Sequence, residues 1–275
     1  MDVIDIKNFY DDQLSKWPLA KTNCEALKTI EKKSFRAGDL NGIVQFNPAR
    51  AVSTLAKVDK TSITQRKCFL CKENRPTEQV SIEIIKDWEL LLNPYPILPY
   101  HFTIANKNHI PQVYDLQIGR KLASKLPGFV VFFNEDGAGA SAPDHNHFQA
   151  VPLKELPLIS LLENTQEILD NIDVPFKISF SEEEINNTFL PKNIYFWRKE
   201  SEDDIKIIAI PRKQHRPRQY YLPFPEKRTI SPGAIDMAGV IVTPCEEDFH
   251  SLNDKEIIDI YRQVGVVKKS NNDPE

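Results

Sequence analysis

The stretch between residues 129 and 150 constrains the fold of this chain more than any other. Phe129–Asn134 is a continuous apolar run of strand length, and such a run is typical of a strand that is buried on both faces. A loop that contains glycines follows, and the chain resumes at Asp144 as DHNHFQA. We therefore predict that both segments are strands of one sheet, joined by a loop of polar and small residues.

The second segment carries polar side chains at alternate positions. If residues 145–150 are extended, His145, His147 and Gln149 share one face of the strand. An imidazole can attack phosphorus directly, a carboxamide can donate to a phosphate oxygen, and N–H groups of a glycine-containing loop can approach that phosphate. The pattern indicates phosphoryl chemistry through a histidine nucleophile. The alternative is that these side chains only decorate an exposed strand.

The surrounding sequence predicts an α+β unit over residues 80–153, with mostly antiparallel strands. Within it we expect a hairpin of Val80–Ile85 and Trp88–Asn93 around Lys86-Asp87, a third strand over His101–Ala105, and a helix over Asp115–Leu126 with Asp115 as N-cap. Weaker patterns predict helices over 8–35, 156–172 and 254–264, extended segments over 42–46, 175–180 and 240–242, and a hairpin of Asn193–Arg198 with Ile205–Ile210. We expect an N-terminal half, residues 1–153, that carries the motifs. We expect residues 154–275 to form a C-terminal half that completes the sheet and the substrate site.

Composition excludes some classes of function. The formal net charge of −4 argues against a protein that coats nucleic acid, because a polyanionic backbone calls for a basic surface. No apolar run approaches the roughly 20 residues that cross a bilayer, and the first residues lack the layout of a signal peptide. The four cysteines fit a reducing compartment better than a disulfide framework. We therefore expect a cytoplasmic protein without nucleic-acid or membrane partners.

Two cysteines have the spacing of metal ligands. Cys68 and Cys71 are two residues apart, so that one turn can present both thiolates to zinc. His109 and one member of the His-x-His pair are candidates for the two remaining ligands of a tetrahedral site. If His145 binds the metal, His147 is left free to react. The alternative is a reduced pair of cysteines without a metal.

Basic residues at two places are candidates for binding phosphate. Arg50 follows a short strand and a turn, and would reach a phosphate if it is more than a solvated charge. The most basic stretch of the chain contains Arg212, Lys213, Arg216 and Arg218, directly after a predicted strand. It is either a solvated loop or a phosphate clamp that acts by charge-assisted hydrogen bonds.

Several short motifs occur in a fixed order in the first half. They are Gln65–Arg75, Leu91–Asn93, His109, Phe132–Asn134 through Gly137, Ser141, His145-Asn146-His147 and Gln149. This order resembles that of galactose-1-phosphate uridylyltransferase, a member of the histidine-triad (HIT) superfamily. The His-x-His-Phe-Gln form is also similar to the GDP-hexose and diadenosine tetraphosphate phosphorylases of that group. The resemblance covers residues 45–153, and over the second half it is only architectural. It implies a HIT-like α+β fold, with a mostly antiparallel sheet, flanking helices and a second similar half packed against it.

The resemblance implies roles for individual residues. His147 would be the nucleophile that forms a nucleotidyl-histidine intermediate, and Gln149 would hold a phosphate oxygen. The expected substrate-binding residues are Asn134, Ser141 and the loop glycines Gly137 and Gly139 at the phosphates, Asn93 near the ribose, Asn74 near the base, and Arg50. The expected ligands of a structural zinc ion are Cys68, Cys71, His109 and His145.

Three departures from the family pattern affect the nucleotide more than the reaction type. Pro94 follows Asn93 where an acid is usual, the segment between Ser141 and His145 is one residue longer, and the histidine motif lacks its usual proline. The sequence therefore does not identify the base of the nucleotide.

The expected function is a nucleotidyltransferase or phosphorylase that acts on a nucleotide sugar or a dinucleoside polyphosphate. Phosphate or a hexose 1-phosphate would be the acceptor. A homodimer is a possible assembly of the chain. Gln149 stands where hydrolases of the superfamily carry a third histidine, and an amide cannot shuttle the proton of water, so that transfer is favoured over hydrolysis. A hydrolase and a catalytically silent nucleotide- or zinc-binding module are the alternatives.

Overall fold

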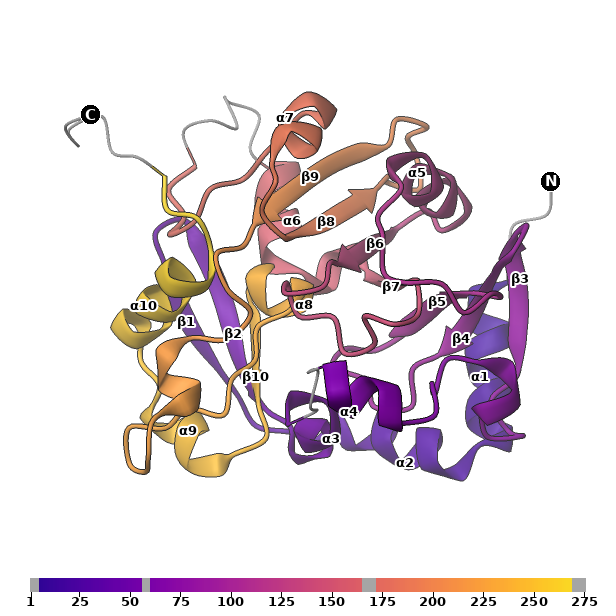
Figure 1. Cartoon of the computed structure of the whole chain (residues 1–275), viewed down its shortest axis with the longest axis horizontal. Helices are drawn as coiled ribbons and strands as arrows, with labels where there is room; N and C mark the ends of the chain where they lie inside the picture. The colour runs from indigo at the N-terminus through magenta and orange to yellow at the C-terminus, as the bar shows by residue number, and fades with distance from the viewer. Residues whose placement is uncertain (1–4, 56–59, 165–171, 269–275) are drawn as a thin grey trace.

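The computed structural model describes residues 5–55, 60–164 and 172–268, and its largest element is a seven-stranded antiparallel sheet (Figure 1). The strand order is β3-β4-β5-β7-β6-β8-β9. The strands are β3 (Ser81–Ile85), β4 (Trp88–Leu92), β5 (Phe102–Asn106), β6 (Phe129–Asn134), β7 (His147–Pro152), β8 (Lys192–Trp197) and β9 (Lys206–Pro211). Together with the flanking helices, this sheet confirms the predicted α+β fold.

Both faces of the sheet are buried, as the apolar run of β6 predicts. Val130 and Phe132 pack into one hydrophobic cluster, whereas Val131 and Phe133 pack into a second cluster on the opposite face. This alternation follows from the two-residue period of a strand. The sheet is therefore the middle layer of the molecule.

Helices α1 (Ile6–Lys16), α2 (Pro18–Ala26) and α5 (Leu116–Lys125) supply buried residues to the second cluster. Pro18 opens α2 at a position where no intrahelical N–H is needed, and so separates it from α1. Asp115 caps α5, since its carboxylate accepts the backbone N–H groups of Gln117 and Ile118. The predicted N-cap is thus confirmed.

The opposite face of the large sheet packs on a three-stranded sheet and further helices. That sheet has the order β1-β2-β10, with β10 parallel to β2. Its strands are β1 (Lys32–Ala37), β2 (Leu40–Phe46) and β10 (Val240–Thr243), and the helices are α6 (Pro157–Asn164), α8 (Ala234–Met237), α9 (Glu246–Ser251) and α10 (Asp254–Val264). Figure 1 shows α8 beside the central strands, where it contacts β6 and β8, and β10 lies next to β2. Residues from both ends of the chain therefore meet on this face.

The remaining described elements are short. They are η1 (Pro48–Arg50), α3 (Ala51–Thr54), α4 (Lys60–Gln65), η2 (Lys72–Asn74), η3 (Leu153–Glu155), α7 (Glu182–Asn187) and η5 (Arg218–Tyr221). Among the described helices, none is both long and apolar enough to cross a bilayer.

Residues after 153 extend the large sheet with β8 and β9 instead of forming a second copy of it. β7 pairs with only one edge of β6, and β8 pairs with the other edge along five residues. The predicted hairpin of β8 and β9 is confirmed. The boundary at residue 153 stays a prediction, since one sheet runs across it.

Some sequence expectations were wrong. Residues 32–35 are part of β1 and not of a helix, because they pair with β2, a partner that local periodicity does not reveal. Residues 175–180 form no strand, and only Ser179 bridges to Ala209 of β9. α6 ends at Asn164, and the rest of the helix expected to residue 172 lies mostly outside the described residues.

Candidate active site

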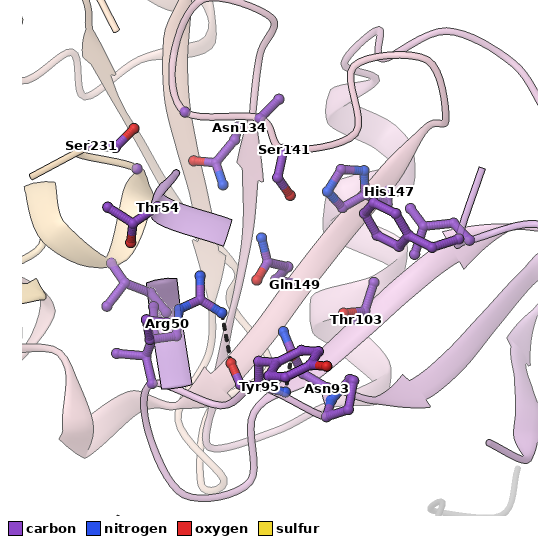
Figure 2. A pocket seen from close by; sticks show the side chains of 18 of the residues that line it. Arg50, Thr54, Asn93, Tyr95, Thr103, Asn134, Ser141, His147, Gln149 and Ser231 are labelled. Atoms are coloured by element: carbon purple, nitrogen blue, oxygen red, sulfur yellow. Dashed lines mark hydrogen bonds between the residues drawn. The ribbon is translucent and has the colours of Figure 1, made fainter. Parts of the chain in front are cut away.

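A cavity of about 640 Å³ lies between the large sheet and the elements packed on it. Thr103, Phe132, His147 and Gln149 line it from the central strands β5, β6 and β7. Other lining residues come from the first half (Arg50, Thr54, Arg66, Phe69, Asn74, Asn93, Tyr95), from the loop after β6 (Gly139, Ala140, Ser141) and from the second half (His215, Arg216, Ser231, Gly233, Asp236). Figure 2 shows His147 and Ser231 on opposite sides of this cavity, with Gln149 between them. Its size is in the range of small-molecule sites.

His147 is the first residue of β7 and presents one ring nitrogen to the cavity. Its Nδ1 lies 2.8 Å from the backbone carbonyl of His145, so that Nδ1 carries the proton and donates it. The lone pair is then on Nε2. The side chain is buried, and burial lowers the pKa of His147 to about 4. A neutral imidazole with a fixed tautomer can act as a nucleophile.

His145 does not continue the strand. β7 begins at His147, and His145 lies in a turn whose N–H bonds to the carbonyl of Ala142. The expectation that residues 145–150 are all extended is therefore wrong for the first two residues. The carbonyl of Asn146 still accepts the N–H of Asn106 of β5, whereas its own N–H bonds to Ile110 outside the sheet. The His145 ring lies beside the cysteines. His147 and Gln149 do share one face, and both line the cavity.

Gln149 is oriented by a histidine that the sequence did not single out. His101 precedes β5 and its Nδ1 accepts the backbone N–H of Ile97, so that Nε2 carries the proton. That Nε2 lies 2.8 Å from Oε1 of Gln149. Burial, then the charge of Arg50, lowers the pKa of His101 to about 3, which keeps the ring neutral. The amide NH₂ of Gln149 is thereby left as the group that a phosphate oxygen can meet.

Gln112 holds the backbone of His147. Strands β6 and β7 pair as far as Phe132 and Gln149, and an extended ladder would place Asn134 opposite His147. At that position the side chain of Gln112 lies between the strands. Its Nε2 donates to the carbonyls of Asn134 and His147, and its Oε1 accepts the N–H of His147, all at 2.9 Å. No sequence signal marked this residue, because its partners are backbone groups of distant segments.

Asn134 ends β6 at the cavity. Its Oδ1 accepts hydrogen bonds from Asn193 and from the backbone of Ala234, which leaves its NH₂ group for a ligand. In the following loop, Gly139 has φ +97°, and a Cβ there would lie 2.6 Å from Cα of Gly233. Only glycine fits this contact between the two halves. Ser141 and Gly139 line the cavity, whereas Gly137, also expected at the phosphates, is not among its lining residues.

The other expected substrate residues lie around the same cavity. Asn93 accepts the backbone N–H of Tyr95 through Oδ1, and Asn74 donates to the carbonyl of Cys68. Arg50 donates to the carbonyl of Tyr95 at 2.6 Å (Figure 2). All three line the cavity together with His147. The structure thus brings together Arg50 and His147, which are 97 positions apart in the sequence.

The four expected zinc ligands form one cluster, which includes His145 in the turn that leads into His147. The ligand atoms of Cys68, Cys71, His109 and His145 all lie within 4.8 Å of one another. The Sγ–Nδ1 distances are 3.4 Å from Cys68 to His145, 3.2 Å from Cys71 to His109 and 3.6 Å from Cys71 to His145. Ligands of tetrahedral zinc are about 2.0–2.3 Å from the metal and therefore roughly 3.3–3.8 Å apart. The three Sγ–Nδ1 distances are close to this range, and two thiolates with two imidazoles are a ligand set that suits zinc.

A second hydrogen bond prepares His145 for a metal. Its Nε2 lies 2.7 Å from the carbonyl of Asn106, so that Nε2 is protonated and Nδ1 offers its lone pair to the cluster. The loop that carries Cys68 and Cys71 also carries Phe69 and Asn74, which line the cavity. An ion at the cluster would therefore hold one wall of the cavity and the turn that leads into His147.

The basic stretch has three different roles. Arg212 is completely buried and donates to backbone carbonyls of Pro232, His215 and Val264 and to the side chain of Asn193. Lys213 and Arg218 are exposed and do not line the cavity. Arg216 alone of these four lines it. The stretch is therefore neither a wholly solvated loop nor a clamp made by all four residues, because its first arginine is buried directly after β9.

The fold is similar to that of solved enzymes. Crystal structures of yeast Ap4A phosphorylase Apa2 in complex with Ap4A and with AMP match with TM-scores of 0.60 and 0.54, at 17% and 16% identity. The alignments cover 96% and 95% of this chain and 99% of that one. A third structure of the same yeast protein matches with a TM-score of 0.54, 16% identity and coverage of 93% and 96%. At this level of identity the likeness shows the fold.

No curated protein matches the sequence. One family model matches residues 9–152, which include β3 to β7, the cluster of cysteines and histidines, His147 and Gln149. The match covers more than half of the chain. The chain therefore belongs to the family described as Domain of unknown function (DUF4922).

Proposed function

We propose that this protein is a nucleotidyltransferase of the phosphorylase type in the HIT-like branch named above, and that its substrate is a dinucleoside polyphosphate. The nucleotide would be transferred first to His147 and then to inorganic phosphate. The fold shared with Ap4A phosphorylase supports this class of substrate over nucleotide sugars and hexose 1-phosphates.

The observation that carries the proposal is the setting of His147. Its Nδ1–H is bound to the His145 carbonyl, which leaves the Nε2 lone pair at the cavity, and Gln149 two residues later lines the same cavity. A nucleophile whose proton lies on the far nitrogen needs no base. The proposal therefore requires only a phosphorus atom placed beside Nε2.

In the first step, Nε2 attacks the innermost phosphorus of the substrate. A P–N bond forms, the P–O bond to the remaining nucleoside polyphosphate breaks, and that group leaves with the electron pair. The carbonyl of His145, which accepts the Nδ1–H, stabilises the positive charge that develops on the ring. In the second step an oxygen of phosphate attacks the same phosphorus, the P–N bond breaks, and a nucleoside diphosphate is released.

The amide groups around His147 match the charge that develops on the phosphate oxygens. The NH₂ groups of Gln149 and Asn134 are both left available by partners that bind their carbonyl oxygens. Donors whose positions are fixed before the reaction stabilise such charge by a few kcal/mol. Neither amide can accept a proton from water at neutral pH, which favours phosphate over water as the acceptor.

Covalent labelling tests the proposal. The protein is incubated with a dinucleoside tetraphosphate that carries ³²P in its innermost phosphates, without added phosphate. We expect about one label per chain, stable in alkali and lost in acid as a phosphohistidine-type bond is. Added phosphate should discharge the label as nucleoside diphosphate.

The variants His147→Asn and His250→Asn provide the matched comparison. His250 is on α9 and does not line the cavity. His147→Asn should bind the nucleotide but take up no label, whereas His250→Asn should label like the wild type. Discharge by water at the same rate as by phosphate would instead identify a hydrolase, and a wild type that binds nucleotide but never labels would identify a silent binding module.

A further inference from the structure

The wall of the cavity opposite His147 is built by residues of the second half of the chain together with Arg50 and Thr54. Figure 2 shows Ser231, Thr54 and Arg50 on one side, and His147 and Asn93 on the other. Arg216, which lines the same cavity, is hydrogen-bonded to Ser231 and Thr54 and therefore belongs to the first group. We call Arg50, Thr54, Arg216 and Ser231 the arginine wall.

The guanidinium group of Arg216 is held from three directions. Its Nε donates to Oγ of Ser231 at 2.9 Å, one Nη donates to the carbonyl of Thr54 at 3.2 Å, and its Cζ lies 4.2 Å from the ring centre of Tyr220. Ser231 is in turn 2.9 Å from Nε2 of His215. A positioned guanidinium group loses little conformational entropy when it binds an anion.

The contacts of the Ser231 hydroxyl define its role. Burial, followed by the charges of Arg216 and Arg212, lowers the pKa of His215 to about 3, so the ring is neutral, and in either tautomer Oγ of Ser231 keeps a lone pair for the Nε–H of Arg216. The oxygen of Ser231 then faces Arg216 as an acceptor. Ser231 is thus a positioning residue for the guanidinium group.

The contacts described above are made to neutral oxygen atoms. Arg216 donates to a hydroxyl and a carbonyl, and Arg50 donates to the carbonyl of Tyr95, and none of these acceptors is charged. Among the described residues, Asp236 is the only carboxylate that lines the cavity, and it accepts backbone N–H groups of Gly233 and Val242. Three arginines, Arg50, Arg66 and Arg216, line the cavity, and Arg66 forms an ion pair with Asp144, so that the lining carries more guanidinium groups than carboxylates.

On the basis of the function proposed above, we propose that the arginine wall is the binding site for the phosphate that leaves in the first step and attacks in the second. The ligand is a phosphate group with at least two negative charges, either free or at the end of a nucleoside polyphosphate. The leaving phosphate group and the attacking phosphate bind at the same position, because the second step is the reverse of the first with a different substituent on the phosphate. Guanidinium groups suit this ligand through paired N–H donors.

Exchange of Arg216 separates this site from the nucleotide site. We expect Arg216→Gln to raise the phosphate concentration for half-maximal discharge of the labelled protein by about ten- to a hundredfold, as expected for loss of charge-assisted bonds. Affinity for a nucleoside monophosphate should change less than threefold. Arg218→Gln is the matched control, since Arg218 lies two residues later, is exposed and does not line the cavity.

Two further variants keep the test decisive if Arg216→Gln fails to fold. Arg216→Lys keeps the charge but not the fork of donors and should show an intermediate loss. Ser231→Ala keeps the arginine and removes its support, and should raise the half-maximal phosphate concentration several-fold. If these folded variants discharge at the phosphate concentration of the wild type, the assignment of the wall is overturned.

Failure of the proposed function has a different signature. If the wild type takes up no label, that function is wrong, and the wall is then tested by titration calorimetry with inorganic phosphate and with tripolyphosphate. Binding that is weakened in Arg216→Gln but not in Arg218→Gln supports the wall without the reaction. Equal binding by both variants, or no binding by the wild type, overturns it. A preference for tripolyphosphate would identify the end of a polyphosphate chain as the ligand, and equal affinity would identify free phosphate.

Discussion

The side-chain amide of Gln112 satisfies both backbone hydrogen-bonding groups of His147, with Oε1 2.9 Å from its N–H and Nε2 2.9 Å from its carbonyl oxygen. It thereby replaces the strand ladder where β6 and β7 separate. The side chain of Gln112 lies in the gap between the two strands beside the proposed nucleophile. One glutamine therefore keeps the start of β7 in place where its pairing with β6 has ended.

Loss of this bridge should slow transfer to His147. We expect Gln112→Ala to lower the rate of labelling about a hundredfold, because a small misplacement of a reacting atom can have that effect. The free energy of unfolding should fall by about 1–3 kcal/mol, since buried backbone groups lose their partners. Gln117→Ala, at an exposed position of α5, is the control for both measurements. An unchanged labelling rate in folded Gln112→Ala would refute the positioning role.

His101 should make stability depend on pH in a defined direction. Burial, then Arg50, lowers its pKa to about 3 in the folded protein, from a value of 6.5 in the unfolded chain. Between these values the unfolded state binds the proton and the folded state does not, so this contribution to stability is complete above about pH 6.5 and is lost as the pH falls toward 3. Unfolding at pH 5 should take up about one proton fewer in His101→Asn than in the wild type.

Urea unfolding of both proteins between pH 5 and 8 measures this difference. The two slopes of free energy against pH should differ below pH 6.5 and coincide above it. His250→Asn serves as the control, because His250 is exposed on α9. Parallel slopes throughout would mean that His101 titrates alike in both states.

Metal analysis tests the cluster of cysteines and histidines. We expect about one zinc ion per chain after purification without chelators, since two thiolates and two imidazoles complete a tetrahedral site. Cys68→Ser and His109→Ala should lose the ion, whereas Cys245→Ser, outside the cluster, should keep it. Chelation should lower the melting temperature of the wild type, because the binding free energy of a structural metal adds to that of folding. A wild type that stays free of metal when expressed with zinc would contradict this site.

Arg212 should matter for folding and not for ligand affinity alone. Its side chain is buried and binds the carbonyls of Pro232, His215 and Val264. We expect Arg212→Gln to lower the free energy of unfolding by about 3 kcal/mol or more, because buried acceptors lose charged donors. Lys213→Gln, one residue later and exposed, should change stability by less than about 0.5 kcal/mol. Similar urea midpoints for the two variants would refute the structural role.

Local pattern predicted much of the fold for physical reasons. β6 matches Phe129–Asn134 residue for residue, because an apolar run of that length fits only a strand with two buried faces. α10 matches 254–264, where Asn253 caps a periodic segment. By contrast, β1 lies where a helix was expected, since its partner β2 becomes visible only in the folded chain.

The sequence by itself determined which chemically capable side chains are present and in what order. The spacing of Cys68 and Cys71 predicted two metal ligands, because spacing is a local property, and the family resemblance implied the other ligands and His147 as nucleophile. The structure brings Cys68, Cys71, His109 and His145 together. Tertiary structure alone decided how these groups are held. Gln112 and His101 act through backbone and amide groups far away in the chain, and Arg212 and Arg216 differ in role because one end of a strand is buried and the adjacent loop faces the cavity. Such contacts depend on which segments meet when the sheet forms, and residue spacing carries no record of that.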